Sequence, residues 1–154
     1  MILCFLPLRA IAACDAPVYR EFDFWLGNWR VTDARGKLLG FDTVTKRLGG
    51  CVIYEEYRDA NDPSVGIGLT GYGLRPGQWH QDFMDDAGFV LALDGSLQSG
   101  RMVLTGTDYV GGMTRLNRGV WSRHGDAVEE LWTSSTDGGT TWKIRFDGWF
   151  HHLP

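Results

Sequence analysis

The stretch WHQDFMDDAGFVLALDGSLQSGRMVL, residues 79–104, alternates short aromatic and apolar segments with signals for tight turns. Gly adopts the positive φ of tight turns without steric cost, and Asp can hydrogen-bond the backbone of its own turn. The turn signals here are Asp86-Ala87-Gly88, Asp94-Gly95 and Ser99-Gly100. They predict three short antiparallel strands, over residues 78–85, 89–94 and 101–106.

The same spacing continues in both directions along the chain. Turn signals recur about every ten residues, from Arg35-Gly36 to Asp137-Gly138-Gly139, between segments rich in β-branched and aromatic residues. No segment has the length and 3.6-residue period of a long helix, and only residues 18–24 indicate a short helical turn. Further strands are expected over residues 24–33, 38–47, 51–59, 65–73, 113–122, 127–134 and 141–150. Together, about ten strands predict an all-β, antiparallel up-and-down sheet, closed as a barrel or folded as a sandwich.

Length and composition indicate one globular domain. The 154 residues are 44% hydrophobic and 22% charged, which is ordinary for a domain with its own core. The net charge is −4 and no basic cluster is present, so a nucleic-acid partner is not expected. No linker or low-complexity tract follows residue 15, and we assign residues 13–154 to a single domain.

Residues 1–12 have the character of a secretory signal. They are apolar apart from Arg9, too short for a transmembrane helix, and end in the small-x-small pattern Ala10-Ile11-Ala12. The positively charged opening of a signal peptide is missing. Cleavage before Ala13 would place the protein in the periplasm or outside the cell. Two alternatives are a lipid anchor, because residues 11–14 also resemble a bacterial lipobox ending at Cys14, and an uncleaved, partly buried strand.

The cysteines favour export. Cleavage before Ala13 would remove Cys4 and leave Cys14 and Cys51. In an oxidising compartment this pair is expected to form a disulfide. Lipidation of Cys14 would exclude that bond and leave Cys51 as a free thiol. We favour the disulfide.

Several segments resemble one family in order along the chain. They are FDFWLGNW (22–29), LGGC (48–51), G-x-W-x-Q-x-x-x-D-x-x-G (77–88), S-x-D-G-G-x-T-W (135–142) and F-D-G-x-F (146–150). The chain resembles a bacterial group of exported lipocalin-like (calycin) domains of unknown function, over about residues 14–150. It departs from the group at Phe83, where Trp is usual. The resemblance implies a calycin barrel in which Trp29 of the G-x-W motif packs across the closed end, beneath an Arg from a late strand, here Arg145.

Strand alternation predicts which side chains point into such a barrel. Several predicted strands place a carboxylate or amide on their aromatic face, which a dry core would not favour. We predict that a small hydrophobic or hydroxyl-bearing ligand, or a cationic one, is held by Glu55, Tyr57, Gln81, Phe83, Asp85, Glu130 and Trp132. Trp29 and Arg145 would close the base. The structural alternative is that one carboxylate pairs with Arg118 or Arg145 and only orients strands.

Other functions are less well supported. The inward carboxylates would suit an isomerase- or cyclase-type enzyme, as in a few calycins, but no nucleophile elbow, phosphate loop or Ser/His/Asp pattern is present. A purely structural barrel is a further alternative. Resemblance to nitrobindin-like calycins would allow haem binding through His80 or His151. The histidines lack metal-ligand spacing, so we expect no metal or other cofactor. The stretch STDGGTTW (135–142) matches the Asp-box of sialidases, but a single copy predicts only a hairpin.

Overall fold

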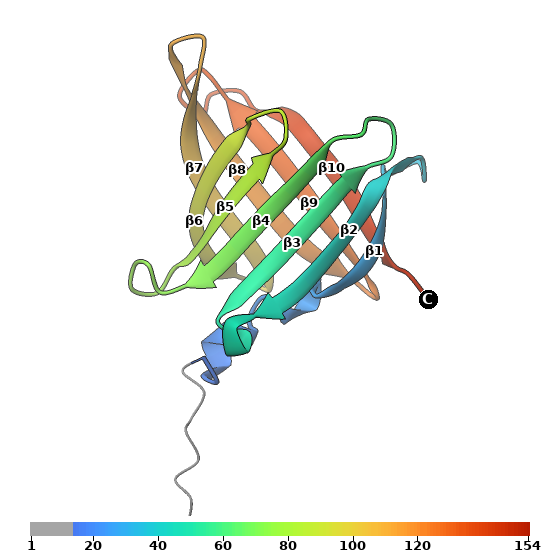
Figure 1. Ribbon diagram of the computed structural model, residues 1–154. Coiled ribbons are helices and arrows are strands. Elements are labelled where there is room, and N and C mark those ends of the chain that lie inside the picture. The colour runs from blue at the N-terminus through green and yellow to red at the C-terminus, as the bar shows by residue number, and fades with distance from the viewer. Residues whose placement is uncertain (1–13) are drawn as a thin grey trace, which may run out of the picture.

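The computed structural model describes residues 14–154 and shows a closed barrel of ten antiparallel strands (Figure 1). Each strand pairs with its sequence neighbours, and β1 pairs with β10 to close the barrel. The strands are β1 (Gly27–Thr32), β2 (Leu38–Arg47), β3 (Val52–Asp59), β4 (Val65–Tyr72), β5 (Trp79–Asp85), β6 (Val90–Gln98), β7 (Arg101–Val110), β8 (Met113–His124), β9 (Ala127–Ser135) and β10 (Lys143–His152). The prediction of an all-β up-and-down barrel is confirmed, and the sandwich alternative is wrong.

Short 3₁₀ helices lie at one end of the barrel. They are η1 (Pro17–Arg20) and η2 (Asp23–Trp25), which precede β1, and η3 (Leu48–Gly50), which joins β2 to β3. In Figure 1 they lie below the strands, at the end that we call the base. The predicted strand over residues 24–33 was too long, because η2 occupies its first two residues and β1 begins only at Gly27.

The predicted turn at Asp94-Gly95 is also wrong. β6 runs through these residues to Gln98. Gly95 is needed for close approach rather than for a turn, since a Cβ at this position would collide with the carbonyl oxygen of Val103 on β7. A glycine inside a strand pattern can mark such an approach of two backbones.

Aromatic side chains fill the base of the barrel. Phe22, Trp25 and Trp29 are all fully buried. The ring centroid of Phe22 lies 5.0 Å from that of Trp25 and 5.3 Å from that of Trp121, so the segment before β1 packs into the barrel interior. The opposite end carries the β1–β2, β3–β4, β5–β6, β7–β8 and β9–β10 turns.

A disulfide holds the N-terminal segment in place. Cys14 is bonded to Cys51, with a sequence separation of 37 residues, and this confirms the predicted pair. The sulfur of Cys14 is therefore not available for a lipid anchor, and that alternative is wrong. The signal-like residues 1–12 lie outside the described residues. Within residues 14–154, no helix is long and apolar enough to cross a membrane.

Candidate functional site

The barrel encloses a cavity of about 170 Å³ above the aromatic base. Its lining consists of Glu55, Tyr57, Gln81, Phe83, Phe89, Leu91, Leu93, Gly119, Trp121, Glu130, Trp132, Arg145, Phe146 and Phe150. Aromatic and aliphatic side chains dominate the wall, and a few polar groups point into it. An engineered apolar cavity of about 150 Å³ is large enough to bind benzene, so this space suits a molecule built on one small ring.

Strand alternation predicted most of the polar lining. Six of the seven residues predicted to face the interior line the cavity together: Glu55, Tyr57, Gln81, Phe83, Glu130 and Trp132. Asp85 does not. Its Oδ1 accepts hydrogen bonds from the backbone N–H of Ala87 (3.0 Å) and Phe89 (2.8 Å), so it fixes the β5–β6 turn. At the end of a strand, the unpaired backbone N–H groups of the following turn can bind a carboxylate, and here they bind that of Asp85.

The predicted contact between Arg145 and Trp29 is wrong. Trp29 pairs with His152, at the base end of β10, and the two rings stack with centroids 3.8 Å apart. Arg145 lies near the other end of β10, where the pairing with β9 shifts between Ile144 and Phe146. Such a bulge re-aims a side chain, and Arg145 lines the cavity. Trp29 itself is buried at the base, as the resemblance implied.

Sequence reasoning missed much of the apolar wall and one interior carboxyl. Leu91 and Leu93 alternate along β6, and this pattern was readable in the sequence. Asp42 lies between Gly40 and Val44 on the buried face of β2 and is only 2% exposed. Neither carboxyl oxygen of Asp42 accepts a hydrogen bond of normal geometry, although the backbone N–H of Thr43 acts on the carboxyl. The same alternation would have placed it inside the barrel.

The interior carboxyls hold their protons more tightly than usual. Burial raises the pKa of Glu55 well above its usual value, and the charges of Asp42 and Glu130 raise it further. Burial also raises the pKa of Glu130 to about 8, with an added contribution from Asp42. The indole N–H of Trp121 partly opposes this shift, although it makes no hydrogen bond of normal geometry.

Asp42 follows the same pattern. Burial raises its pKa to about 7, the backbone N–H of Thr43 opposes the shift, and the charge of Glu56 adds to it. Burial likewise raises the pKa of Tyr57, whose hydroxyl stays neutral. At pH 7 the protonated carboxyls of Glu55 and Glu130 and the Tyr57 hydroxyl can therefore both donate and accept hydrogen bonds.

No cation neutralises these carboxyls in the part of the chain that the structure describes. The alternative that Arg118 or Arg145 pairs with one of them is not realised, because no ion pair joins either arginine to an interior carboxyl within residues 14–154. Arg118 is exposed on the outer face of β8. The one polar partner of Glu55 is Gln81, whose Nε2 donates to Oε2 at 3.4 Å.

A second set of polar side chains fixes one wall of the cavity. Arg115 Nε donates to Asp108 Oδ1 at 2.8 Å, and Asn117 Nδ2 donates to the same oxygen at 2.8 Å. Asn117 Oδ1 in turn accepts a hydrogen bond from Trp132 Nε1 at 3.0 Å. This chain of contacts sets the orientation of the Trp132 ring beside Phe89, whose centroid lies 5.6 Å away.

Glycines on β4 make room for the cavity side chains. A Cβ at Gly68 would collide with the Glu55 carboxyl, and one at Gly66 would collide with the ring of Phe83. Gly68 pairs directly with Glu55 and with Phe83, whereas Gly66 pairs with Tyr57 and with Asp85. The small residues of β4 thus allow larger side chains from β3 and β5 to lie over it.

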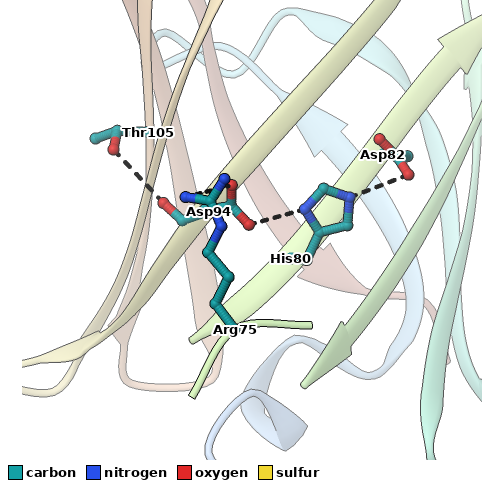
Figure 2. Close-up of polar contacts among 5 residues, drawn as sticks. All are labelled: Arg75, His80, Asp82, Asp94 and Thr105. Carbon is teal, nitrogen blue, oxygen red and sulfur yellow. Dashed lines mark hydrogen bonds and ion pairs between the residues drawn. The ribbon is translucent and has the colours of Figure 1, made fainter. Parts of the chain in front are cut away.

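The histidines proposed as haem ligands lie outside the cavity. Figure 2 shows His80 between two carboxylates, with Nδ1 2.9 Å from Asp94 Oδ1 and Nε2 3.1 Å from Asp82 Oδ2. His151 is exposed on β10. Neither ring lines the cavity, so neither can ligate a haem held inside the barrel. Residues 14–154 also contain no cluster of three or more metal-ligating side chains.

The Asp-box stretch forms the turn between β9 and β10. The Asp137 carboxylate accepts hydrogen bonds from the backbone N–H of Thr141 at 2.9 Å and from the Ser135 hydroxyl at 2.7 Å. These bonds lower the pKa of Asp137 and hold the turn, as the hairpin interpretation predicted.

Comparisons with known proteins do not assign the chain to a family. No protein-family model matches the chain, and a search of curated proteins found no significantly similar sequence. The function is therefore argued from the cavity: its polar groups can orient a ligand, and its aromatic wall can bury one.

Proposed function

We propose that the protein binds a small molecule inside its barrel and that it belongs to the exported bacterial lipocalin-like domains that its sequence resembles. The observation that carries the proposal is the cavity of about 170 Å³, in which apolar and aromatic side chains surround a few inward polar groups. This composition is typical of sites for small ligands, where apolar contacts provide affinity and polar groups fix orientation. Burying apolar surface of such a ligand contributes about 25 cal/mol per Å².

The arrangement of the barrel favours entry from one end. Phe22 and Trp25 fill the base, and η1 and η2 lie beneath it (Figure 1). Arg145 lies towards the opposite end, near the start of β10. A ligand would therefore enter past Arg145 and reach Glu55 and Glu130 further inside.

We also propose a periplasmic or secreted location. The disulfide between Cys14 and Cys51 is the form expected in an oxidising compartment, and residues 1–12 resemble a secretory signal. Both observations support export.

An enzymatic role is a second candidate, because one observation favours it. Glu130 has a pKa of about 8, which is close to the value that suits a general acid or base at neutral pH. An isomerase or cyclase would use Glu130 or Glu55 to move a proton on a bound substrate. Turnover of a ligand by the wild type, lost in Glu130→Gln with binding retained, would support this role.

A calorimetric titration with 2-phenylethanol tests the binding function. We expect saturable binding of one molecule per chain. Leu93→Trp places an indole in the cavity and should abolish it, whereas Ala92→Trp places the same ring on the exposed outer face of β6 and should leave it unchanged. Thermal melts establish that both variants fold. Absence of binding to the wild type, or equal binding to folded Leu93→Trp, would contradict the proposal.

A further inference from the structure

We propose that the ligand is a small organic cation, a protonated amine whose nitrogen lies between Glu55 and Glu130 and whose apolar body packs against Trp132 and Phe146. This inference rests on the proposed binding function and names the chemical class of the ligand. It follows from the positions of the interior carboxyls, their lack of cationic partners and the nature of the wall around them.

Glu55 and Glu130 reach the cavity from different walls. Glu55 is on β3 and Glu130 on β9, and β2, β1 and β10 separate these strands on the shorter way round the barrel. Glu55 is 5% exposed and has a single long hydrogen bond, from Gln81. Glu130 keeps some solvent contact and lines the same cavity. A ligand between the two walls can contact both carboxyls.

Asp42 is a third buried carboxyl, close enough for its charge to act on Glu55 and Glu130, although it is not among the residues that line the cavity. It lies on the buried face of β2, is 2% exposed, and accepts no hydrogen bond of normal geometry at either carboxyl oxygen. A buried polar group without a partner is costly in a folded protein. Its negative charge, when present, adds to the field at Glu55 and Glu130.

The other groups that face this site leave an excess of carboxyls. Tyr57 of β3 and Arg145 of β10 also line the cavity, and Arg145 is exposed. Asp108 of β7 and Arg115 of β8 neutralise each other in an ion pair. The inward positions that β1, β4, β5 and β6 contribute around the cavity are uncharged, such as Val31, Gly68, Gln81 and Leu93. Two cavity carboxyls, Glu55 and Glu130, therefore outnumber the one arginine that lines the cavity, within the described part of the chain, and Asp42 is buried beside them.

A cation suits this environment better than a neutral or anionic group. A hydrogen bond between an ammonium and a carboxylate is roughly twice as strong as one between two neutral groups. Trp121 and Trp132 also line the cavity, and a cation over the face of an indole ring gains a cation–π attraction. An anion would meet carboxyls at the inner end of the cavity and be repelled once they ionise.

Binding of an amine should release a proton. In the empty barrel the carboxyls hold protons at neutral pH, because burial favours their neutral forms. An ammonium that enters stabilises a carboxylate, so one carboxyl loses its proton to solvent while the amine keeps its own. The affinity for an amine should therefore rise with pH as long as the amine remains protonated.

Three probes with similar bodies separate the possible ligand classes: 2-phenylethylamine, 2-phenylethanol and 3-phenylpropionate. In calorimetric titrations at pH 8, we expect the amine to bind about 10- to 100-fold more tightly than the alcohol, and the carboxylate most weakly. Glu55→Gln and Glu130→Gln should reduce the affinity for the amine to that for the alcohol. The matched control Glu129→Gln changes a neighbouring outward-facing residue of β9 and should leave it unchanged.

The outcomes distinguish this inference from the binding function itself. Equal affinities for the amine and the alcohol would contradict the proposal of a cationic ligand and leave the binding function intact. Tightest binding of 3-phenylpropionate would have the same consequence. Failure of all three probes to bind would overturn both. If a Gln variant does not fold, titration of the wild type with the amine in two buffers of different ionisation heat replaces it. Release of about one proton is expected, and release of none would overturn the inference.

Discussion

The side-chain amide of Gln81 donates a hydrogen bond to the carboxyl of Glu55 inside the barrel, with 3.4 Å between Nε2 and Oε2. An amide can satisfy part of the carboxyl's hydrogen-bonding capacity but cannot neutralise its charge. Burial therefore favours the protonated form of the Glu55 carboxyl, and it does the same for the Glu130 carboxyl across the cavity. The carboxyls of Glu55 and Glu130 make both the free energy of unfolding and the affinity for a ligand dependent on pH.

The free energy of unfolding should fall as the pH rises from about 5 to about 9. Glu130 has a pKa near 8 in the folded protein and near 4.5 when unfolded, so the folded state binds more protons in this interval. Its contribution is fully present below pH 4.5 and is lost as the pH passes the folded pKa. Each unit of pKa difference corresponds to about 1.4 kcal/mol. Urea unfolding at pH 5, 7 and 9 measures the effect.

Two variants test whether Glu130 causes this pH dependence of the free energy of unfolding. Glu130→Gln cannot ionise and should flatten the fall between pH 5 and 8, whereas Glu129→Gln, on the outer face of β9, should not. A stability that rises over this interval in the wild type would show that the interior carboxyls are already ionised.

His80 should titrate above the usual value of about 6.5 for histidine. Burial alone would lower its pKa, but the hydrogen bonds to Asp94 and Asp82 outweigh that effect (Figure 2). Its contribution to stability is therefore present below pH 6.5 and lost as the pH rises through the folded pKa. An NMR titration of the imidazole C–H protons measures the value. Asp94→Asn should lower it, and a wild-type value at or below 6.5 would contradict the ion-pair geometry.

Loss of the disulfide should lower the free energy of unfolding by about 4 kcal/mol, from the chain-entropy relation for a loop of this length. The bond joins residues 37 apart and ties the segment that carries η1 and η2 to the start of β3. Urea unfolding of the Cys14→Ser, Cys51→Ser double variant tests this. A change below about 1 kcal/mol would show that the N-terminal segment is held by packing alone.

Trp25→Ala should destabilise the barrel by about 3–5 kcal/mol, because it removes a fully buried ring from the base. Trp142→Ala is the matched control, since Trp142 is 43% exposed beside the β9–β10 turn and should cost much less. Thermal and urea unfolding of both variants provide the comparison. Similar losses from the two substitutions would mean that η2 does not close the barrel.

The fold and much of the site could be predicted because strand alternation is a local property. Glu55 and Tyr57 on β3, and Gln81 and Phe83 on β5, line the cavity as their spacing indicated. The errors arise where the alternation is interrupted. A bulge beside Arg145 redirects one side chain of β10 into the cavity.

The remaining errors depend on tertiary contacts that no local pattern contains. Turn amides hold Asp85 at the end of β5, and η2 replaces the first residues of a predicted strand because Phe22 and Trp25 pack into the base. The local sequence Asp94-Gly95 predicts a turn, and only the close approach of β7 explains why Gly95 lies within a strand.

The central claim is that a small molecule binds inside the barrel, and the tryptophan indole N–H resonances test it most directly. Trp121 and Trp132 line the cavity, whereas Trp142 donates its indole N–H to the Gly139 carbonyl oxygen outside it. In ¹H–¹⁵N spectra recorded during addition of 2-phenylethylamine, we expect saturable shifts of the Trp121 and Trp132 signals and a nearly constant Trp142 signal. Unchanged Trp121 and Trp132 signals with 2-phenylethylamine, and again with 2-phenylethanol and 3-phenylpropionate, would contradict the account.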